Sequence, residues 1–148
     1  MIIGIGSDHG GFLLKTEVIK CLKAQGHEVI DEGCYDTNSV DYPKYAYTVA
    51  QDIISKKCEA GVLICTTGEG MAISANKVKG IRAALVTNSD QALYARLHND
   101  ANIICMGAKY TTPDDACTYV TRFLSTKFDG GRHLRRVDLI KDIEEKEN

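Results

Sequence analysis

One stretch of the chain, Val62–Lys77, places a strand pattern, a glycine loop and a helix pattern in direct succession. The apolar run Val62–Ile64 is typical of a buried parallel strand. Gly68 and Gly70 then allow the backbone to turn, and a run of alanine, isoleucine and serine predicts a helix. This order of elements presents backbone N–H groups to an anion at a helix N-terminus. The stretch therefore favours an α/β architecture with a ligand site at the loop.

The same alternation of strand and helix patterns continues along the chain. We expect strands at 2–7, 27–31, 62–64, 81–86 and 102–106, and helices at 12–25, from 43, at 71–79, at 89–97, from 112 and at 133–145. Thr112-Pro113-Asp114-Asp115 suits a helix start because it supplies a cap, a proline and two acids. Residues 1–148 are therefore predicted to form a single domain. Its fold is a doubly wound, Rossmann-like, five-stranded parallel sheet with helices on both faces and a C-terminal helix.

Composition excludes several classes of protein. The chain of 148 residues is 44% hydrophobic and 26% charged, as is usual for a globular domain. A net charge of −2 argues against a general binder of nucleic acid or of membrane surfaces. No apolar run approaches the roughly 20 residues of a membrane span. The start lacks a basic region followed by a long apolar core, so we expect no signal peptide and a cytoplasmic location.

Cysteine spacing argues against a metal site. The six cysteines form no C-x-x-C pair and no His/Cys ligand pattern; they are Cys21, Cys34, Cys58, Cys65, Cys105 and Cys117. We therefore predict free thiols in a reducing compartment, with no disulfide framework and no bound metal.

Chemically active side chains follow the predicted strands. In doubly wound sheets, ligands bind beyond the carboxyl ends of the strands, so Asp8 and His9 should meet the Cys65 loop at one edge. That loop carries a thiol, two hydroxyls and a carboxylate in Cys65, Thr66, Thr67 and Glu69. The alternatives are a buried structural cysteine, and an Asp8 helix cap beside a surface histidine. The loop is neither a P-loop nor a cysteine phosphatase loop, since it lacks Gly-Lys-Ser/Thr and has Met71 where the phosphatase arginine belongs.

A basic run begins the last predicted helix. Arg132, His133, Arg135 and Arg136 stand where the helix dipole disfavours positive charge. An anion such as a phosphate held between them would explain the run, and a solvated basic patch is the alternative. His98 precedes a strand, which puts it at the wrong edge of the sheet for a site in the same subunit. His98 is either a surface residue or a contribution to the site of a second subunit.

Several motifs in chain order carry a family resemblance. They are Gly6-x-Asp8-His9-x-Gly11, Asp41-Tyr42-Pro43, Cys65-x-Thr67-Gly68-x-Gly70, Ala75-Asn76-Lys77, Gly80-Ile81-Arg82-Ala83, His98-Asn99-Asp100 and Gly130-Gly131-Arg132-His133. Together they resemble the type B ribose-5-phosphate isomerases and the related galactose-6-phosphate isomerase subunits. The resemblance covers essentially the whole chain. It implies a metal-free and cofactor-free sugar-phosphate isomerase that forms homodimers with shared active sites; pairing of dimers into tetramers stays open.

The resemblance also implies roles for individual residues. Cys65 matches the catalytic base, Thr67 a helper in ring opening, and His98 the ring-opening histidine. The implied substrate contacts are Asp8, His9, Tyr42, Thr66, Gly68, Gly70, Asn99, Arg132 and Arg136. Within this set, the arginines match phosphate ligands, and the glycines match the loop that holds an enediolate oxygen. The family often has glycine at the Thr66 position, and Glu69 receives no role.

The implied reaction interconverts ribose 5-phosphate and ribulose 5-phosphate through a cis-enediolate. Two alternatives remain. The first is an isomerase for a six-carbon phosphate, such as allose or galactose 6-phosphate. The second is a non-catalytic module that binds sugar phosphates.

Overall fold

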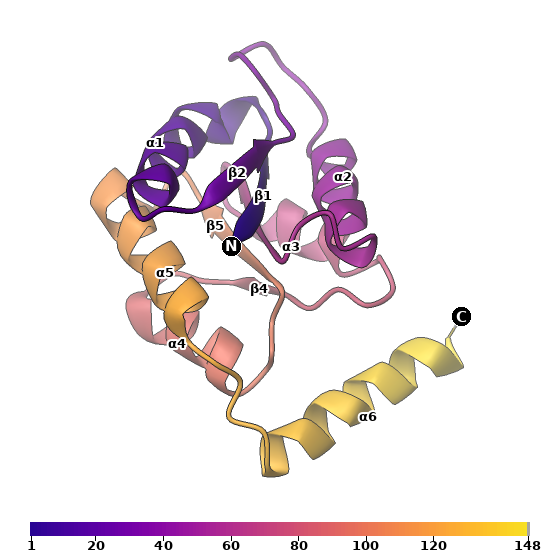
Figure 1. Cartoon of the computed structure of the whole chain (residues 1–148). Coiled ribbons are helices and arrows are strands. Elements are labelled where there is room, and N and C mark those ends of the chain that lie inside the picture. Colours follow the sequence, from indigo (N-terminus) through magenta and orange to yellow (C-terminus); the bar gives the residue numbers. More distant parts are fainter. Residues whose placement is uncertain (148) are drawn as a thin grey trace.

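The computed structural model describes residues 1–147, which form a five-stranded parallel sheet flanked by helices (Figure 1). The elements are β1 (Ile2–Ser7), a 3₁₀ turn (His9–Gly11), α1 (Phe12–Ala24), β2 (Glu28–Asp31), α2 (Tyr42–Ile54), β3 (Ala60–Cys65), α3 (Glu69–Ala75), β4 (Ala83–Leu85), α4 (Ser89–Leu97), β5 (Ile103–Gly107), α5 (Pro113–Ser125) and α6 (Arg132–Lys146). The predicted fold class is confirmed.

The sheet has the strand order β2-β1-β3-β5-β4, and all neighbouring strands are parallel. The chain leaves β1 toward β2 on one side, and it leaves β3 toward β4 on the other. The connections therefore diverge between β1 and β3, which opens a crevice beyond the carboxyl ends of these strands. Ser7 pairs with Ile64 in the register of β1 and β3, so Asp8 and Cys65 follow at the same level of the sheet.

Helices cover both faces of the sheet. On one face, α1, α4 and α5 bury apolar side chains that include Val18, Leu22 and Phe123. On the other face, α2 and α3 bury Val49 and Met71. The strands lie between these two layers, which explains why their sequences are almost continuously apolar.

Most predicted elements differ from the observed bounds by one or two residues, and in two elements side-chain hydrogen bonds account for the difference. The helix expected at 71–79 is α3, which begins at Glu69 and ends at Ala75. It ends there because the Asn76 side chain pairs with the backbone of Ala83, at 2.9 Å to the carbonyl and 2.8 Å from the N–H. The strand expected at 81–86 is limited to Ala83–Leu85, because the Arg82 N–H donates to the Asn102 side chain at 2.9 Å.

The prediction of free thiols is wrong for two cysteines. Cys21 of α1 and Cys117 of α5 form a disulfide, with their Cα atoms 5.9 Å apart. These residues are 96 positions apart in the chain, and only the packing of α1 against α5 brings them together. A cross-link of this kind typically contributes about 2–4 kcal/mol to stability. The other four cysteines, Cys34, Cys58, Cys65 and Cys105, are free as predicted.

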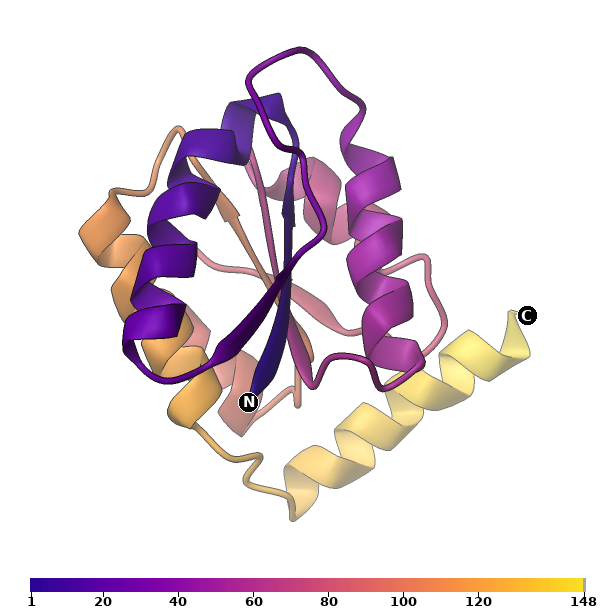
Figure 2. The same ribbon diagram turned by 45° about the horizontal axis from the view of Figure 1, so that its top comes forward.

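Helix α6 projects away from the body of the domain (Figures 1 and 2). It starts near the amino ends of the strands and leaves several apolar side chains exposed: Leu134, Leu139, Ile140 and Ile143. An exposed apolar face of this kind is typical of a surface that contacts another molecule. Within residues 1–147, no helix combines the length and the apolar character that crossing a membrane requires.

Candidate active site

A cavity of about 260 Å³ lies at the crevice between β1 and β3. Asp8, Tyr42, Cys65, Thr66, Thr67 and Gly70 line it. The fold thus brings together six of the residues that the sequence singled out. They come from the end of β1, the start of α2 and the loop after β3, three segments that meet only at the carboxyl edge of the sheet.

Cys65 is the last residue of β3 and is only 4% exposed. Its Sγ accepts a hydrogen bond from the Gly68 N–H at 3.2 Å. Gly68 has a φ of +81°, and a Cβ there would lie 2.6 Å from Leu85 and 2.7 Å from the carbonyl carbon of Met106. Glycine is therefore required at the position that directs this N–H at the sulfur.

The remaining free cysteines lie outside the cavity. Burial, with a smaller contribution from nearby Cys65, raises the pKa of the Cys105 thiol. Burial and the neighbouring Asp52 carboxylate raise the pKa of Cys58 to about 11. Both thiols therefore stay protonated at neutral pH. Within residues 1–147, Cys65 is the cysteine that the fold places against the cavity.

The walls of the cavity approach one another closely. A Cβ on Gly70 would lie 2.5 Å from the Tyr42 ring, so the ring lies directly against the Gly70 backbone. Opposite, a Cβ on Gly10 would lie 2.3 Å from the Thr66 hydroxyl. Thr67 Oγ1 accepts the N–H of Glu69 at 3.3 Å, which turns the loop into α3. Tyr42, Thr66 and Thr67 are thereby fixed around Cys65.

Asp8 and His9 form the turn after β1. Asp8 is 7% exposed, and its Oδ1 accepts the Gly11 N–H at 3.1 Å. This contact is the cap that was the alternative interpretation of Asp8, but the residue also lines the cavity. His9 is exposed, and its Nδ1 lies 3.2 Å from the N–H of Val40, the donor in this contact.

The other predicted site residues form a second group at the amino edge of the sheet, which we call the basic cluster: His98, Asn99, Arg132, His133 and Arg136. The His98 and His133 rings stack with centroids 4.1 Å apart and an interplanar angle of 11°. A hydrogen bond of 3.0 Å from the Asp129 N–H to the Leu97 carbonyl brings the start of α6 beside the end of α4.

Positive charge accumulates in the basic cluster. Burial, the adjacent His98 and the guanidinium groups of Arg132 and Arg136 lower the pKa of His133, and Asp129 offsets this in part. The side chains of Arg132 and Arg136 are exposed, and neither forms an ion pair or a side-chain hydrogen bond within residues 1–147. A bound anion would relieve this repulsion.

The turn that carries His98 and Asn99 is held rigidly. Asp100 has a φ of +46°. Its carboxylate pairs with Arg96 at 2.9 Å and with Arg82 at 3.2 Å. Arg82 Nε also donates to the Asn99 carbonyl at 3.1 Å. These contacts fix the direction in which the end of α4 presents its side chains.

One chain does not bring the cavity and the basic cluster together, because they lie at opposite edges of the sheet. His98, Asn99, Arg132 and Arg136 contribute nothing to the cavity that contains Cys65. Sequence reasoning placed His133 in the basic run that could hold an anion, but it assigned no role to Tyr94, whose ring centroid lies 4.7 Å from that of His98. In the sequence, the spacing of four residues between Tyr94 and His98 was the one sign that their rings lie close together, because residues four apart are neighbours on a helix surface.

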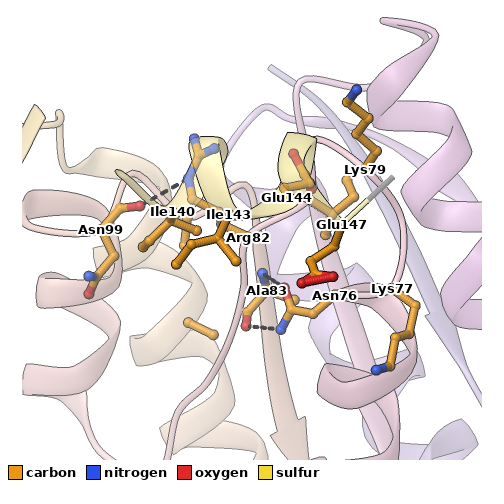
Figure 3. Close-up of a pocket in the computed structure, with 13 residues that line it drawn as sticks. Asn76, Lys77, Lys79, Arg82, Ala83, Asn99, Ile140, Ile143, Glu144 and Glu147 are labelled. Atoms are coloured by element: carbon orange, nitrogen blue, oxygen red, sulfur yellow. Dashed lines mark hydrogen bonds between the residues drawn. The ribbon is translucent and has the colours of Figure 1, made fainter. Parts of the chain in front are cut away.

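A larger groove of about 610 Å³ lies between α6 and the β4 edge (Figure 3). Ile140, Ile143 and Glu144 of α6 line one side of it, facing Arg82 and Ala83. The residues that line the groove include Asn99 but none of the six residues that line the cavity. No cysteine is among them. We place the chemistry at the smaller cavity, where the polar groups converge.

No cluster of three or more histidine, cysteine, aspartate or glutamate side chains suited to a metal ion occurs within residues 1–147. The donor set of the cavity consists of one thiol, one carboxylate and three hydroxyls. These are groups for proton transfer and for hydrogen bonding to a polyol.

The fold and the cavity define a doubly wound α/β protein with a cysteine-containing small-molecule site at its topological switch point. Residues 3–140 match the family model described as Ribose/Galactose Isomerase, and the chain belongs to this family.

Individual relatives agree with this membership. The chain is 46% identical over 147 residues to a protein of Bacillus subtilis named putative sugar phosphate isomerase YwlF, and the alignment covers 99% of each of the two chains. The ribose-5-phosphate isomerase B structure from Clostridium thermocellum superposes with a TM-score of 0.98 at 49% identity and covers 100% of both chains. The Mycoplasma genitalium ribose-5-phosphate isomerase B structure with bound ribulose 5-phosphate superposes with a TM-score of 0.92 at 40% identity. The match covers 97% of this chain and 96% of that one.

Proposed function

We propose that this protein interconverts ribose 5-phosphate and ribulose 5-phosphate through a cis-enediolate, with Cys65 as the base. The observation that carries the proposal is the placement of Cys65, whose sulfur accepts the Gly68 N–H at 3.2 Å at the cavity of a ribose/galactose isomerase fold. The bound ribulose 5-phosphate in the Mycoplasma genitalium relative supports a pentose phosphate as the substrate.

The reaction needs one base that reaches two neighbouring carbons. After the sugar ring opens, the Cys65 thiolate removes the proton from C2 and returns it to C1, while the O2 hydroxyl proton moves to O1. The aldehyde thus becomes a hydroxymethyl group and C2 becomes a ketone, with no net gain or loss of atoms or electrons. Thr67 and Asp8 lie in the same cavity, where each can form a hydrogen bond to a sugar hydroxyl during ring opening. Negative charge develops on the substrate oxygen in the transition state. The Gly68 and Glu69 N–H groups already donate to Cys65 Sγ and Thr67 Oγ1, which leaves the Gly70 N–H as the loop donor that can stabilise this charge. In acyl transfer, one such donor is worth about 3–4 kcal/mol.

The phosphate requires a separate site of positive charge. The six residues of the cavity include no arginine and no lysine. The basic cluster has the required charge, and guanidinium groups bind phosphate oxygens in a bidentate manner. Binding a remote phosphate fixes the reacting carbons against the base.

A second copy of the chain resolves the separation of the two groups. We infer a two-fold symmetric homodimer in which the basic cluster of one subunit completes the cavity of the other. In such a dimer each contact occurs twice, so two complete sites form. The exposed apolar residues of α6 and the groove beneath them support this arrangement, because both offer surface for a second subunit (Figure 3).

A substrate panel tests the proposed function directly. The chain, purified alone and with a chelator present, is incubated with ribose 5-phosphate, allose 6-phosphate and galactose 6-phosphate, and products are followed by NMR. We expect ribulose 5-phosphate to form from ribose 5-phosphate at the highest kcat/KM. If a six-carbon phosphate is preferred, the proposed substrate is wrong but the proposed isomerisation chemistry stands. Tight binding of every sugar phosphate without turnover would make the protein a binding module.

A further inference from the structure

The connector between β2 and α2, residues 32–41, arches over the carboxyl end of the sheet (Figure 2). It contacts the turn that carries Asp8 and His9 from both sides. Near its start, the Gly33 carbonyl accepts the Ser7 N–H at 2.6 Å, and the Cys34 N–H donates to the Ser7 carbonyl at 2.8 Å. Near its end, the Val40 N–H donates to His9 Nδ1 at 3.2 Å. The connector therefore holds both the backbone before this turn and the imidazole within it.

A partly buried ion pair anchors the start of the connector. Lys15 of α1 is 1% exposed, and its Nζ donates to both oxygens of Asp31, at 2.6 and 2.7 Å. Asp31 Oδ1 also accepts the Gly33 N–H at 2.9 Å, so one carboxylate joins α1, β2 and the connector. The rings of Phe12 and Tyr35 lie 5.5 and 5.7 Å from the same Nζ. Because Lys15 is buried, loss of its carboxylate partner would leave an uncompensated buried charge, so this anchor resists movement.

The contact with Val40 determines which nitrogen of His9 carries the proton. A backbone N–H can only donate, so Nδ1 must be the unprotonated acceptor, and in the neutral ring the proton resides on Nε2. Nδ1 is occupied by the connector, which leaves Nε2–H free to contact a ligand. Such a donor suits a sugar hydroxyl or a phosphate oxygen.

We propose that the connector is a positioning segment: anchored by Lys15 and Asp31, it holds His9 through the Val40 N–H as an Nε2–H hydrogen-bond donor beside the cavity. The identity of the ligand rests on the proposed function, but the state of His9 does not. Val40 acts through His9, and none of Lys15, Asp31 and Val40 lines the cavity.

The test compares Val40→Pro, which removes the backbone N–H, with Val40→Ala, which keeps it and serves as the matched control. Long-range ¹H–¹⁵N NMR spectra report the tautomer of His9 without substrate. We expect the Nε2–H form in the unmodified protein and in Val40→Ala, and a mixture of tautomers in Val40→Pro. With ribose 5-phosphate, Val40→Pro should raise KM about 3- to 10-fold, the size of one neutral hydrogen bond, with a smaller change in kcat.

Several results overturn the proposal. An Nδ1–H form of His9 in the unmodified protein contradicts it at once and requires no variant, which covers the case in which Val40→Pro fails to fold. Equal KM values for folded Val40→Pro and Val40→Ala also contradict it. Absence of turnover in all forms, with the expected NMR result, would count against the proposed function and leave the positioning of His9 standing.

Discussion

Cys65→Ala is expected to abolish isomerisation while the protein stays folded and still binds phosphorylated ligands. The thiol is the base at the end of β3, and losing a positioned general base typically costs about 10²- to 10⁴-fold in rate. The substitution removes one atom from a loop whose shape depends on Gly68, so the fold should persist. Activity is measured by conversion of ribose 5-phosphate, and folding by circular dichroism.

Cys105→Ala is the matched control for this variant. Cys105 is a fully buried cysteine on the neighbouring strand β5, and it does not line the cavity. We expect this control to retain activity at temperatures where it remains folded. Activity of Cys65→Ala within about tenfold of the unmodified protein would remove Cys65 as the base, because even a weak general base contributes more than that. Glu69→Gln would then be the next variant to examine.

Arg136→Ala is expected to raise KM strongly for phosphorylated sugars. Arg132 and Arg136 are four residues apart on α6 and share one face of the helix. Losing a charge-assisted contact of roughly 1.5–3 kcal/mol should cost about 10- to 150-fold in affinity. The loss of kcat/KM should be larger with ribose 5-phosphate than with free ribose, because only the phosphate ester has the group being held.

Two further variants sharpen this test. Arg135→Ala removes an exposed arginine from a different face of the same helix turn and should leave KM nearly unchanged. Arg136→Lys keeps the charge but not the bidentate geometry, and should recover only part of the affinity. If Arg132→Ala and Arg136→Ala both leave the kinetics with ribose 5-phosphate unaltered, the basic cluster is a solvated face. The phosphate contact must then be sought first at His9.

The sequence predicted the layout of the cavity because that layout depends on local order. In a parallel sheet, residues that follow strands gather at one edge, and Asp8 and Cys65 each follow a strand directly. The order of the strands could not be predicted from the sequence. The position of β5 between β3 and β4 depends on contacts between segments that are far apart in the chain. The bounds of α3 were missed for a similar reason, since they depend on side-chain contacts between Asn76 and Ala83.

Contacts between distant segments were also beyond sequence reasoning. Cys21 and Cys117 meet only because two helices pack side by side, and no spacing rule links positions so far apart. The stacking of His98 on His133 depends on where the last turn before α6 folds back. The Val40 contact with His9 involves a backbone N–H, which every residue except proline carries, so the sequence contains no signal for it.

The central claim is that each active site combines Cys65 of one subunit with His98 of the other, and mixed dimers test it most directly. Cys65→Ala and His98→Ala subunits with different affinity tags are unfolded together, refolded and purified through both tags. Each parent dimer should be nearly inactive, whereas a mixed dimer contains one site in which both residues are intact. Two-fold symmetry then predicts recovery of about half of the unmodified activity per dimer. Mixed dimers no more active than their parents, or a fully active monomer, would contradict the shared site.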